Sequence, residues 1–90
     1  MIKIEYSERF LKDLKSLKNY NVYDQIKKLC FDELPSCSDL KSVKNLKKMV
    51  SFKNYFRIKV GNYRIGLKVE KNVVTILRVL HRNEIYKYFP

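Results

Sequence analysis

Residues 55–80 read YFRIKVGNYRIGLKVEKNVVTILRVL and consist of three short runs rich in Val, Ile, Tyr and Phe, in which apolar and polar residues alternate. Such alternation is typical of strands that bury one face. Gly61-Asn62 and, more weakly, Lys71-Asn72 separate the runs with residues that tolerate the positive φ of two-residue hairpin turns. The sequence therefore predicts an antiparallel meander with strands at 55–60, 63–70 and 73–80.

The first of these turns also predicts which residues face one another. If Val60 lies opposite Tyr63, then Lys59 lies opposite Arg64, and alternate residues share a face. The apolar face then carries Phe56, Ile58, Val60, Tyr63, Ile65, Leu67 and Val69. The opposite face carries Arg57, Lys59, Arg64 and Lys68. We expect the first face to form the core and the second to form a basic plate.

The basic plate needs a physical reason, because like charges placed directly across strands are destabilising. The charged ends can spread into water while their stems cover apolar surface, or an anionic ligand can lie on the plate. The residues alone leave both explanations open. Arg78 falls on the apolar face in this register, so either the register shifts near it or it lies at a sheet end.

The net charge of +11 is distributed unevenly along the 90 residues. Residues 1–51 contain eleven Lys or Arg against seven Asp or Glu, and residues 52–90 contain nine against two. A charge of this size attracts polyanions, and arginine suits bidentate phosphate binding. We expect a polyanion partner, although an acidic protein would be attracted by the same charge. The lysines of residues 39–51 either form a solvated surface or extend the plate.

Length and composition favour one soluble domain that spans residues 1–90. Hydrophobic residues make up 46% of the chain, which is enough for a packed core. No apolar run is long enough to cross a membrane, and the N-terminus lacks the apolar segment of a signal peptide. We therefore expect a cytoplasmic protein with no membrane partner. Cys30, Cys37 and the single His81 make no zinc set, so we expect reduced thiols and neither metal nor cofactor.

The chain before the meander reads as one strand followed by two helices. Residues 1–6 predict a half-buried strand, and residues 7–17 predict a helix capped by Ser7. A second helix begins with Asn21 as its cap and ends at Pro35, which makes an antiparallel helical hairpin over the apolar face of the sheet. The lysine-rich segment that follows is either a helical turn or a loop with short β character. The segment after the last strand is either a helical turn or a short edge strand, and the fold class is α+β.

The sequence contains no glycine-rich phosphate loop, Ser/His/Asp set or pair of catalytic carboxylates. Groups able to bind phosphate or move protons gather in the meander and its tail: Arg57, Lys59, Arg64, His81, Arg82 and Tyr86. Cleaving RNA through its own 2′-OH needs a base, charge stabilisation at the phosphate and a proton donor for the 5′-oxygen. Cations stabilise the charge, and Tyr86, His81 or a lysine whose pKa is lowered by neighbouring cations can transfer protons. Tyr86 can equally be packing at the core edge, and His81 a structural or exposed residue.

The segment FRIKVGNYRIGLKVE, followed by VTILRVLHRNEIYKYFP, resembles the paired hairpin and tail of the RelE/ParE superfamily of toxin–antitoxin toxins. The order of strand, helical hairpin and meander is similar to the RelE-like microbial RNase fold over nearly the whole chain. The resemblance is closest to the RelE-type mRNA interferases. It implies a cytoplasmic, metal-independent endoribonuclease that cuts mRNA in the ribosomal A site and inhibits translation. It also implies a cognate acidic antitoxin, and binding of promoter DNA only as the toxin–antitoxin complex.

The resemblance also assigns roles to individual residues. Lys59 would transfer a proton, and Arg64 and Arg82 would stabilise the charge on the phosphate. Tyr86 would orient a base or stack on it. Arg57 stands where a lysine is usual, so it can bind phosphate but is a poor proton shuttle. Further RNA or phosphate contacts are predicted at Arg57, His81, Lys47, Lys48 and Lys68.

Two other functions are compatible with the same sequence. A ParE-like member of the superfamily would share the fold but inhibit DNA gyrase and cleave nothing. The presence of Lys59, Arg64, Arg82 and Tyr86 together favours RNA cleavage, because gyrase inhibitors usually lack this set. A non-catalytic nucleic-acid-binding module would need only the charge, and its cations would be interchangeable.

Overall fold

The computed structural model describes residues 3–90 and contains a five-stranded sheet in the order β1-β5-β4-β3-β2. Its strands are β1 (Lys3–Tyr6), β2 (Leu46–Lys48), β3 (Tyr55–Val60), β4 (Tyr63–Glu70) and β5 (Val73–His81). β1 runs parallel to β5, and the other pairs are antiparallel. The meander is therefore confirmed, with its last strand one residue longer than predicted. Met1 and Ile2 of the predicted first strand lie outside the described residues.

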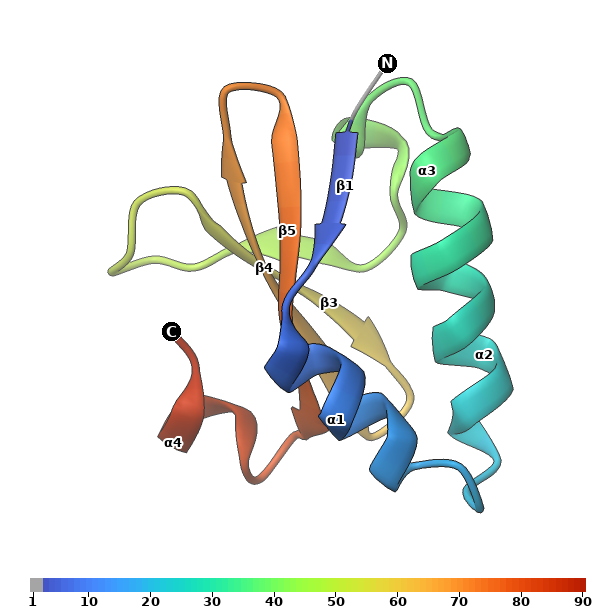
Figure 1. The fold of residues 1–90 in the computed structure, drawn as a ribbon. Helices are drawn as coiled ribbons and strands as arrows, with labels where there is room; N and C mark the ends of the chain where they lie inside the picture. Colours follow the sequence, from blue (N-terminus) through green and yellow to red (C-terminus); the bar gives the residue numbers. More distant parts are fainter. Residues whose placement is uncertain (1–2) are drawn as a thin grey trace.

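Two helical segments follow β1 and lie against the sheet (Figure 1). The first is α1 (Glu8–Ser16), and the second runs through α2 (Val22–Lys28), the π-helical turn η1 (Leu29–Glu33) and α3 (Leu34–Ser36). Ser7 caps α1 as predicted, because its Oγ accepts a hydrogen bond of 3.0 Å from the Phe10 N–H.

The second helix begins directly after Asn21, as predicted, but the predicted side-chain cap and the predicted end at Pro35 are wrong. Asn21 has a helical backbone, and its side chain makes no capping hydrogen bond. Pro35 does not stop the helix, which continues to Ser36. Proline is tolerated here because it lies in the first turn of α3, directly after a π-helical turn in which the Leu34 N–H bonds to the Leu29 carbonyl.

The predicted apolar face of the sheet forms the main core together with the helices. Its buried members are Phe10, Leu14, Leu17, Ile26, Cys30, Leu34, Ile58, Val60, Ile65, Leu67, Val74, Ile76 and Val79. None of these side chains is more than 7% exposed. The Tyr6 hydroxyl donates a 2.7 Å hydrogen bond to the Cys30 carbonyl, so β1 is tied to the second helical segment through a polar contact at the edge of this core.

The observed hairpin turns and strand register match the predicted ones except at one position between β4 and β5. Gly61 has a φ of 58°, and Lys71 and Asn72 have φ of 48° and 68°. Val60 pairs with Tyr63, as expected. Between Gly66 and Leu67, however, the pairing of β4 with β5 shifts, so that Leu67 faces Ile76 while Gly66 faces Arg78. This irregularity moves Arg78 off the apolar face, which confirms the alternative of a register shift.

The sequence left alternatives for two segments, the lysine-rich residues 39–51 and the tail after β5, and both adopt short regular structure. Residues 39–51 contain a 3₁₀ turn η2 (Leu40–Ser42) as well as the edge strand β2. The tail forms the helical turn α4 (Ile85–Tyr88), not an edge strand. In the described part of the chain, no helix is long and apolar enough to span a bilayer.

The two cysteines lie in different environments, which gives a test of the packing. Burial raises the pKa of the Cys30 thiol to about 12 from its ordinary 9.0, whereas Cys37 is only half-buried. We predict that Ellman's reagent near pH 8 labels one thiol per folded chain and two after unfolding. Because the folded pKa is raised, the stability that comes from burying the neutral thiol should be present below about pH 9 and lost as pH rises toward 12.

Cys37→Ser provides the control for this labelling experiment, since it should remove the fast-reacting thiol. Rapid labelling of both cysteines in the folded protein would contradict the placement of Cys30 in the main core.

Candidate active site

The second face of the sheet is covered in its middle, which corrects the expectation of a continuous basic plate. Met49, Ile85 and Phe89 form a small second core there, with Tyr55, Leu77 and Leu80 packed around it. Ile85 and Phe89 belong to α4 and the residue after it, which fold back from the end of β5 (Figure 1). The basic residues of this face are therefore divided into a group near the β3–β4 turn, Arg78 beneath the tail, and Lys68 at the other end.

A glycine allows the tail to approach the sheet this closely. A Cβ at position 66 would lie 2.7 Å from two carbons of the Phe89 ring, well inside van der Waals contact. Gly66 is itself buried in the middle of β4. A glycine inside a strand often marks such a close approach, so Gly66 is a signal for this contact in the sequence, although the sequence does not say which residue approaches it.

The aromatic residues of α4 are anchored along one row of residues that crosses the sheet. Gly66 lies opposite Arg57 on β3 and Arg78 on β5. The Arg57 guanidinium lies 5.7 Å from the centre of the Tyr86 ring, and the Arg78 guanidinium lies 5.8 Å from that of Tyr88. Cation–π attraction at such distances stabilises the tail. Tyr86 is still 57% exposed as a residue, so it remains open to a ligand.

Arg78 is held by an acidic partner and is not a free cation. Its Nε donates to Asp13 Oδ2 at 2.7 Å and its Nη2 to Asp13 Oδ1 at 3.0 Å, with both side chains largely buried. Asp13 Oδ2 also accepts the Val79 N–H at 3.2 Å. The hydrogen bond to Asp13 raises the pKa of Arg78 despite the opposing effect of burial. This bidentate pair fastens α1 to β5 and fixes the cation beneath Tyr88.

Three of the predicted catalytic residues come together around the Gly61-Asn62 turn. Lys59 and Arg64 face each other across the strands that the turn connects. Arg64 Nη1 donates to the carbonyls of Gly61 and Tyr63 at 3.1 and 3.0 Å, which folds the guanidinium over the turn. The backbone N–H of Arg82 donates to the Asn62 carbonyl at 2.8 Å, and its side chain is exposed.

The fourth predicted catalytic residue, Tyr86, lies beside this group. Its partner Arg57 precedes Lys59 by two residues on β3, so the two cations point from the same face of the strand. Lys47 lies opposite Arg57 and shares that face. These exposed or half-exposed cations lie next to the exposed ring of Tyr86. We refer to them as the cluster: Lys47, Arg57, Lys59, Arg64 and Arg82.

The other predicted RNA contacts do not join this cluster. Lys48 lies opposite Phe56, which puts it on the other face of the sheet. The His81 ring packs edge-on against the Tyr63 ring, with 5.4 Å between ring centres, on the face of the sheet opposite to Arg64. Its Nδ1 accepts a hydrogen bond of 3.2 Å from the Asn83 N–H. Lys68 shares the face of the cluster but pairs with Glu70 at 3.1 Å, and this hydrogen bond raises its pKa.

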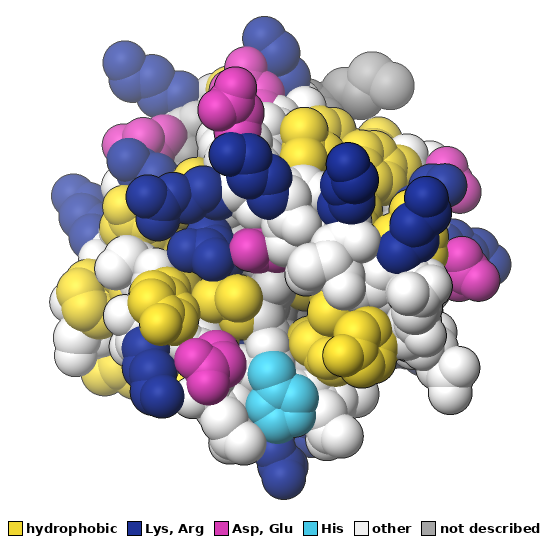
Figure 2. Space-filling view, turned by 60° about the horizontal axis from the view of Figure 1, so that its bottom comes forward, with side chains coloured by type: hydrophobic (Ala, Val, Ile, Leu, Met, Phe, Trp, Pro, Cys, Tyr) yellow, Lys and Arg dark blue, Asp and Glu magenta, His cyan; other side chains and the backbone are white. Residues whose placement is uncertain are grey.

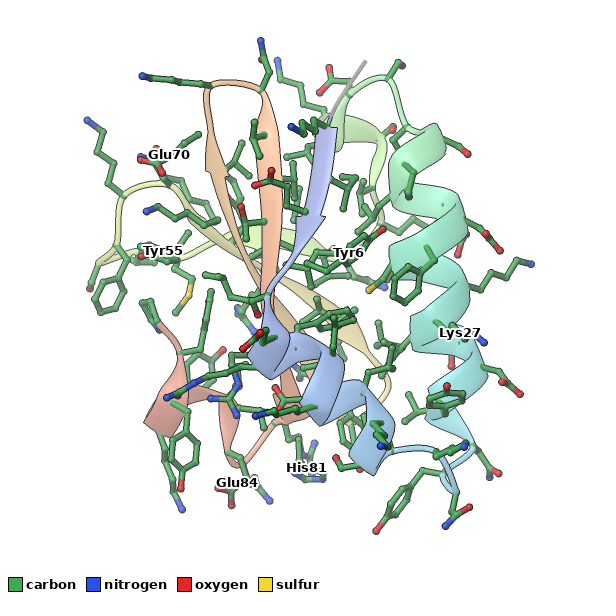
Figure 3. All side chains as sticks on the ribbon, in the orientation of Figure 1. Tyr6, Lys27, Tyr55, Glu70, His81 and Glu84 are labelled. Atoms are coloured by element: carbon green, nitrogen blue, oxygen red, sulfur yellow. The ribbon has the colours of Figure 1, made fainter. Side chains whose placement is uncertain are left out.

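Figure 2 views the molecule with its lower end brought forward, and basic side chains gather across the upper half of this view, whereas mostly apolar and uncharged surface surrounds His81. Figure 3 shows His81 and Glu84 close together at the same end. Across residues 3–90, no group of three or more His, Cys, Asp or Glu side chains is arranged to hold a metal ion.

Comparison with known proteins gives consistent matches. Residues 4–86 match the family described as the ParE toxin of type II toxin-antitoxin system, parDE. The chain is 40% identical to Toxin RelE3 of Methanocaldococcus jannaschii over 90 residues, which is 99% of this chain and 100% of that protein. It superimposes with a TM-score of 0.79 and 38% identity on a chain of the RelB-RelE antitoxin-toxin complex from Methanococcus jannaschii, covering 96% and 99% of the two chains. YafQ of Escherichia coli shares the fold, with a TM-score of 0.73 at 20% identity and coverage of 96% and 99%.

The contact between Gly66 and Phe89 leads to a prediction about the tail. Gly66→Ala should push the Phe89 ring away and destabilise the protein by about 1–3 kcal/mol, the usual range for overpacking. Hydrogen exchange at residues 85–89 should accelerate more than exchange in β3 or α1. Chemical denaturation and exchange mass spectrometry measure the two effects.

A double-mutant cycle with Phe89→Ala isolates the contact. Once the Phe89 ring is removed, Gly66→Ala should lower the free energy of unfolding much less, so the effects of the two substitutions should be strongly non-additive. Additive costs with unchanged exchange at the tail would show that the tail does not depend on this contact.

Proposed function

The chain belongs to the RelE/ParE superfamily of toxins of type II toxin–antitoxin systems, and on that premise we propose that it is a metal-independent endoribonuclease that cuts mRNA on the ribosome. The observation that supports this most is the gathering of Lys59, Arg64 and Arg82 around one hairpin turn. An exposed aromatic ring, Tyr86, lies beside them. Cleavage at this site would inhibit translation.

The proposed reaction uses the RNA's own 2′-hydroxyl as nucleophile. The 2′-oxygen loses its proton to a base and attacks the adjacent phosphorus, and the bond from phosphorus to the 5′-oxygen breaks. The 5′-oxygen takes up a proton, so the products carry a 2′,3′-cyclic phosphate and a 5′-hydroxyl. Charge builds up on the phosphate oxygens in between, and preorganised cations stabilise it.

The side chains of the cluster suit separate parts of this reaction. Arginine guanidinium groups keep their protons, so we assign Lys59 to proton transfer and assign Arg64 and Arg82 to the phosphate. Arg64 uses Nη1 for the turn carbonyls, which leaves its Nη2 and Nε donors for a phosphate oxygen. Within residues 3–90, the Lys59 and Arg82 side chains have neither a hydrogen-bond nor an ion-pair partner, so both are available to an anion.

Tyr86 and Arg57 would bind the nucleotide next to the cut. One side of the Tyr86 ring meets the Arg57 guanidinium, and the side chain is 57% exposed. The open side can stack on an unpaired base, a contact typical of single-stranded RNA recognition. Arg57 would hold the ring in place and bind a neighbouring phosphate, in line with its poor suitability for proton transfer.

The partners of the proposed enzyme follow from its charge and its relatives. The related complex from Methanococcus jannaschii contains a RelB antitoxin with its RelE toxin. For this chain, a net charge of +11 would attract a cognate acidic antitoxin. Promoter DNA would be bound only by the toxin–antitoxin complex. Because mRNA in the ribosomal A site is the proposed substrate, the protein would act in the cytoplasm.

Inhibition of DNA gyrase is the second candidate function, because the matching family is described by the name ParE. That activity would need the fold and the charge but no proton-transfer group. The grouping of a lysine with two arginines and an open aromatic ring favours RNA cleavage over it. Gyrase supercoiling and mRNA integrity can be assayed on the same protein preparation.

A translation reaction with purified components tests the proposal. We expect the protein to cut mRNA at A-site codons, detected by primer extension. Arg64→Ala should lower the cleavage rate by about 100-fold or more, the usual effect of removing a group that stabilises transition-state charge. Tyr86→Ala should lower it through weaker binding and positioning of the base.

Lys28→Ala is the matched control, since it removes an exposed positive charge from α2 and should leave cleavage unchanged. Intact mRNA after incubation with the wild-type protein would refute the proposed function. Loss of supercoiling in the parallel assay would then favour gyrase inhibition.

A further inference from the structure

A second aromatic and basic surface continues from α4 toward the loop between β2 and β3. We propose that this surface, formed by Phe52, Lys53, Tyr55 and Lys68, binds single-stranded RNA several nucleotides away from the cut. The inference deepens the proposed function and rests on it, because it describes where the same RNA continues after leaving the cluster. We call this surface the distal RNA subsite.

The aromatic rings form an unbroken series from the tail to the loop. Phe89 and Tyr55 meet edge to face with 5.6 Å between ring centres, and Tyr55 and Phe52 meet in the same way at 6.4 Å. The Lys68 ammonium lies 5.7 Å from the centre of the Tyr55 ring. Figure 3 shows Tyr55 beside the projecting loop, at the opposite end of the sheet from His81. The distal subsite therefore begins where the small second core ends.

The loop carries apolar side chains that folding does not explain. Residues 50–53 project from the body of the molecule, as the yellow-green loop in Figure 1. Phe52 is 45% exposed and Val50 is fully exposed, at 102%. Neither side chain belongs to the main core or to the second core. The exposed Phe52 ring, held edge to face against Tyr55, is open to stacking on a base.

The charge around the loop identifies the class of ligand. Residues 47–54 contain three lysines and no acidic residue. Lys68 adds a further cation beside the Tyr55 ring, although it is paired with Glu70. A groove or track that combines cations with stacking rings matches single-stranded nucleic acid, whose phosphates and base faces alternate. An acidic peptide would use the lysines but gain little from the exposed Phe52 ring.

The distance also suits RNA that already occupies the cluster. Lys59 and Tyr55 point from the same face of β3 and are four residues apart, which is roughly 13 Å along a strand. Phe52 lies beyond Tyr55 by one further ring contact. A strand of RNA that leaves Tyr86 in this direction would cross the exposed part of Tyr55 and reach Phe52 after several nucleotides.

Binding of a non-cleavable oligonucleotide tests the distal subsite apart from catalysis. The probe is a 12-nucleotide 2′-O-methyl RNA with one 2-aminopurine, whose position is moved along the strand. For the wild-type protein we expect stacking to quench 2-aminopurine at two separated positions. Quenching at one position should disappear in Tyr86→Ala and at the other in Phe52→Ala, and Phe52→Ala should raise the Kd at least about fivefold.

Two variants serve as controls in the same assay. Phe52→Tyr keeps an aromatic face and should bind like the wild type. Tyr20→Ala removes a ring that is 59% exposed in the turn between α1 and α2, and it should leave the Kd unchanged. Thermal unfolding of each variant verifies that the fold is intact.

Several results would overturn the inference. These are an unchanged Kd for Phe52→Ala, an equal loss for Tyr20→Ala, or a Phe52→Ala defect confined to antitoxin binding, which would make the loop a protein-docking element. Failure of the wild-type protein to bind the oligonucleotide would also overturn it. The proposed cleavage of mRNA is tested separately, by the translation reaction with the wild-type protein and Arg64→Ala.

Discussion

The close contact of Phe89 with Gly66 is the constraint on which the functional end of this protein depends. Because residue 66 has no side chain, the Phe89 ring can lie directly on β4. The irregular pairing beside Gly66 brings Arg78 into the same row, where Asp13 neutralises it and Tyr88 covers it. The tail is thus held at several points, and Tyr86 lies over Arg57 as a consequence. An ordinary side chain at position 66 would remove this arrangement without touching the main core.

The second face carries many cations, and most of them have a local partner. Arg78 pairs with Asp13, Lys68 with Glu70, and Arg64 with two turn carbonyls. Arg57 is covered by the Tyr86 ring. These contacts explain how like charges on neighbouring strands are tolerated. They also leave Lys47, Lys59 and Arg82, among the described residues, as cations of the cluster without a side-chain partner, and an anionic substrate would stabilise all three.

Local sequence signals were sufficient for the meander but not for the surface that covers it. The turn residues at 61–62 and 71–72 predicted the strands and the facing of Lys59 and Arg64, because short turns determine register. The strict alternation of side chains between the two faces of the sheet fails at Arg78. One extra residue in β5 at this point places Arg78 on the face opposite to the predicted one. Lys48 was assigned to the RNA-binding set without a strand register, and β2 turns it to the other face. Gly66 signals a close approach to β4 but not that Phe89 makes it. The pairing of Asp13 with Arg78 is a long-range contact that residue patterns do not reveal.

The cluster at the β3–β4 turn is proposed to cut RNA by moving a proton from the 2′-hydroxyl, and this step can be measured directly. Ribosomes programmed with a message that carries a single 2′-deoxynucleotide at the cut codon would be compared with ribosomes carrying the all-ribose message. We predict that the all-ribose message is cut and yields a downstream fragment with a 5′-hydroxyl, whereas the 2′-deoxy message stays intact at that position. Cleavage of both messages, or a 5′-phosphate on the downstream fragment, would contradict the proposed chemistry.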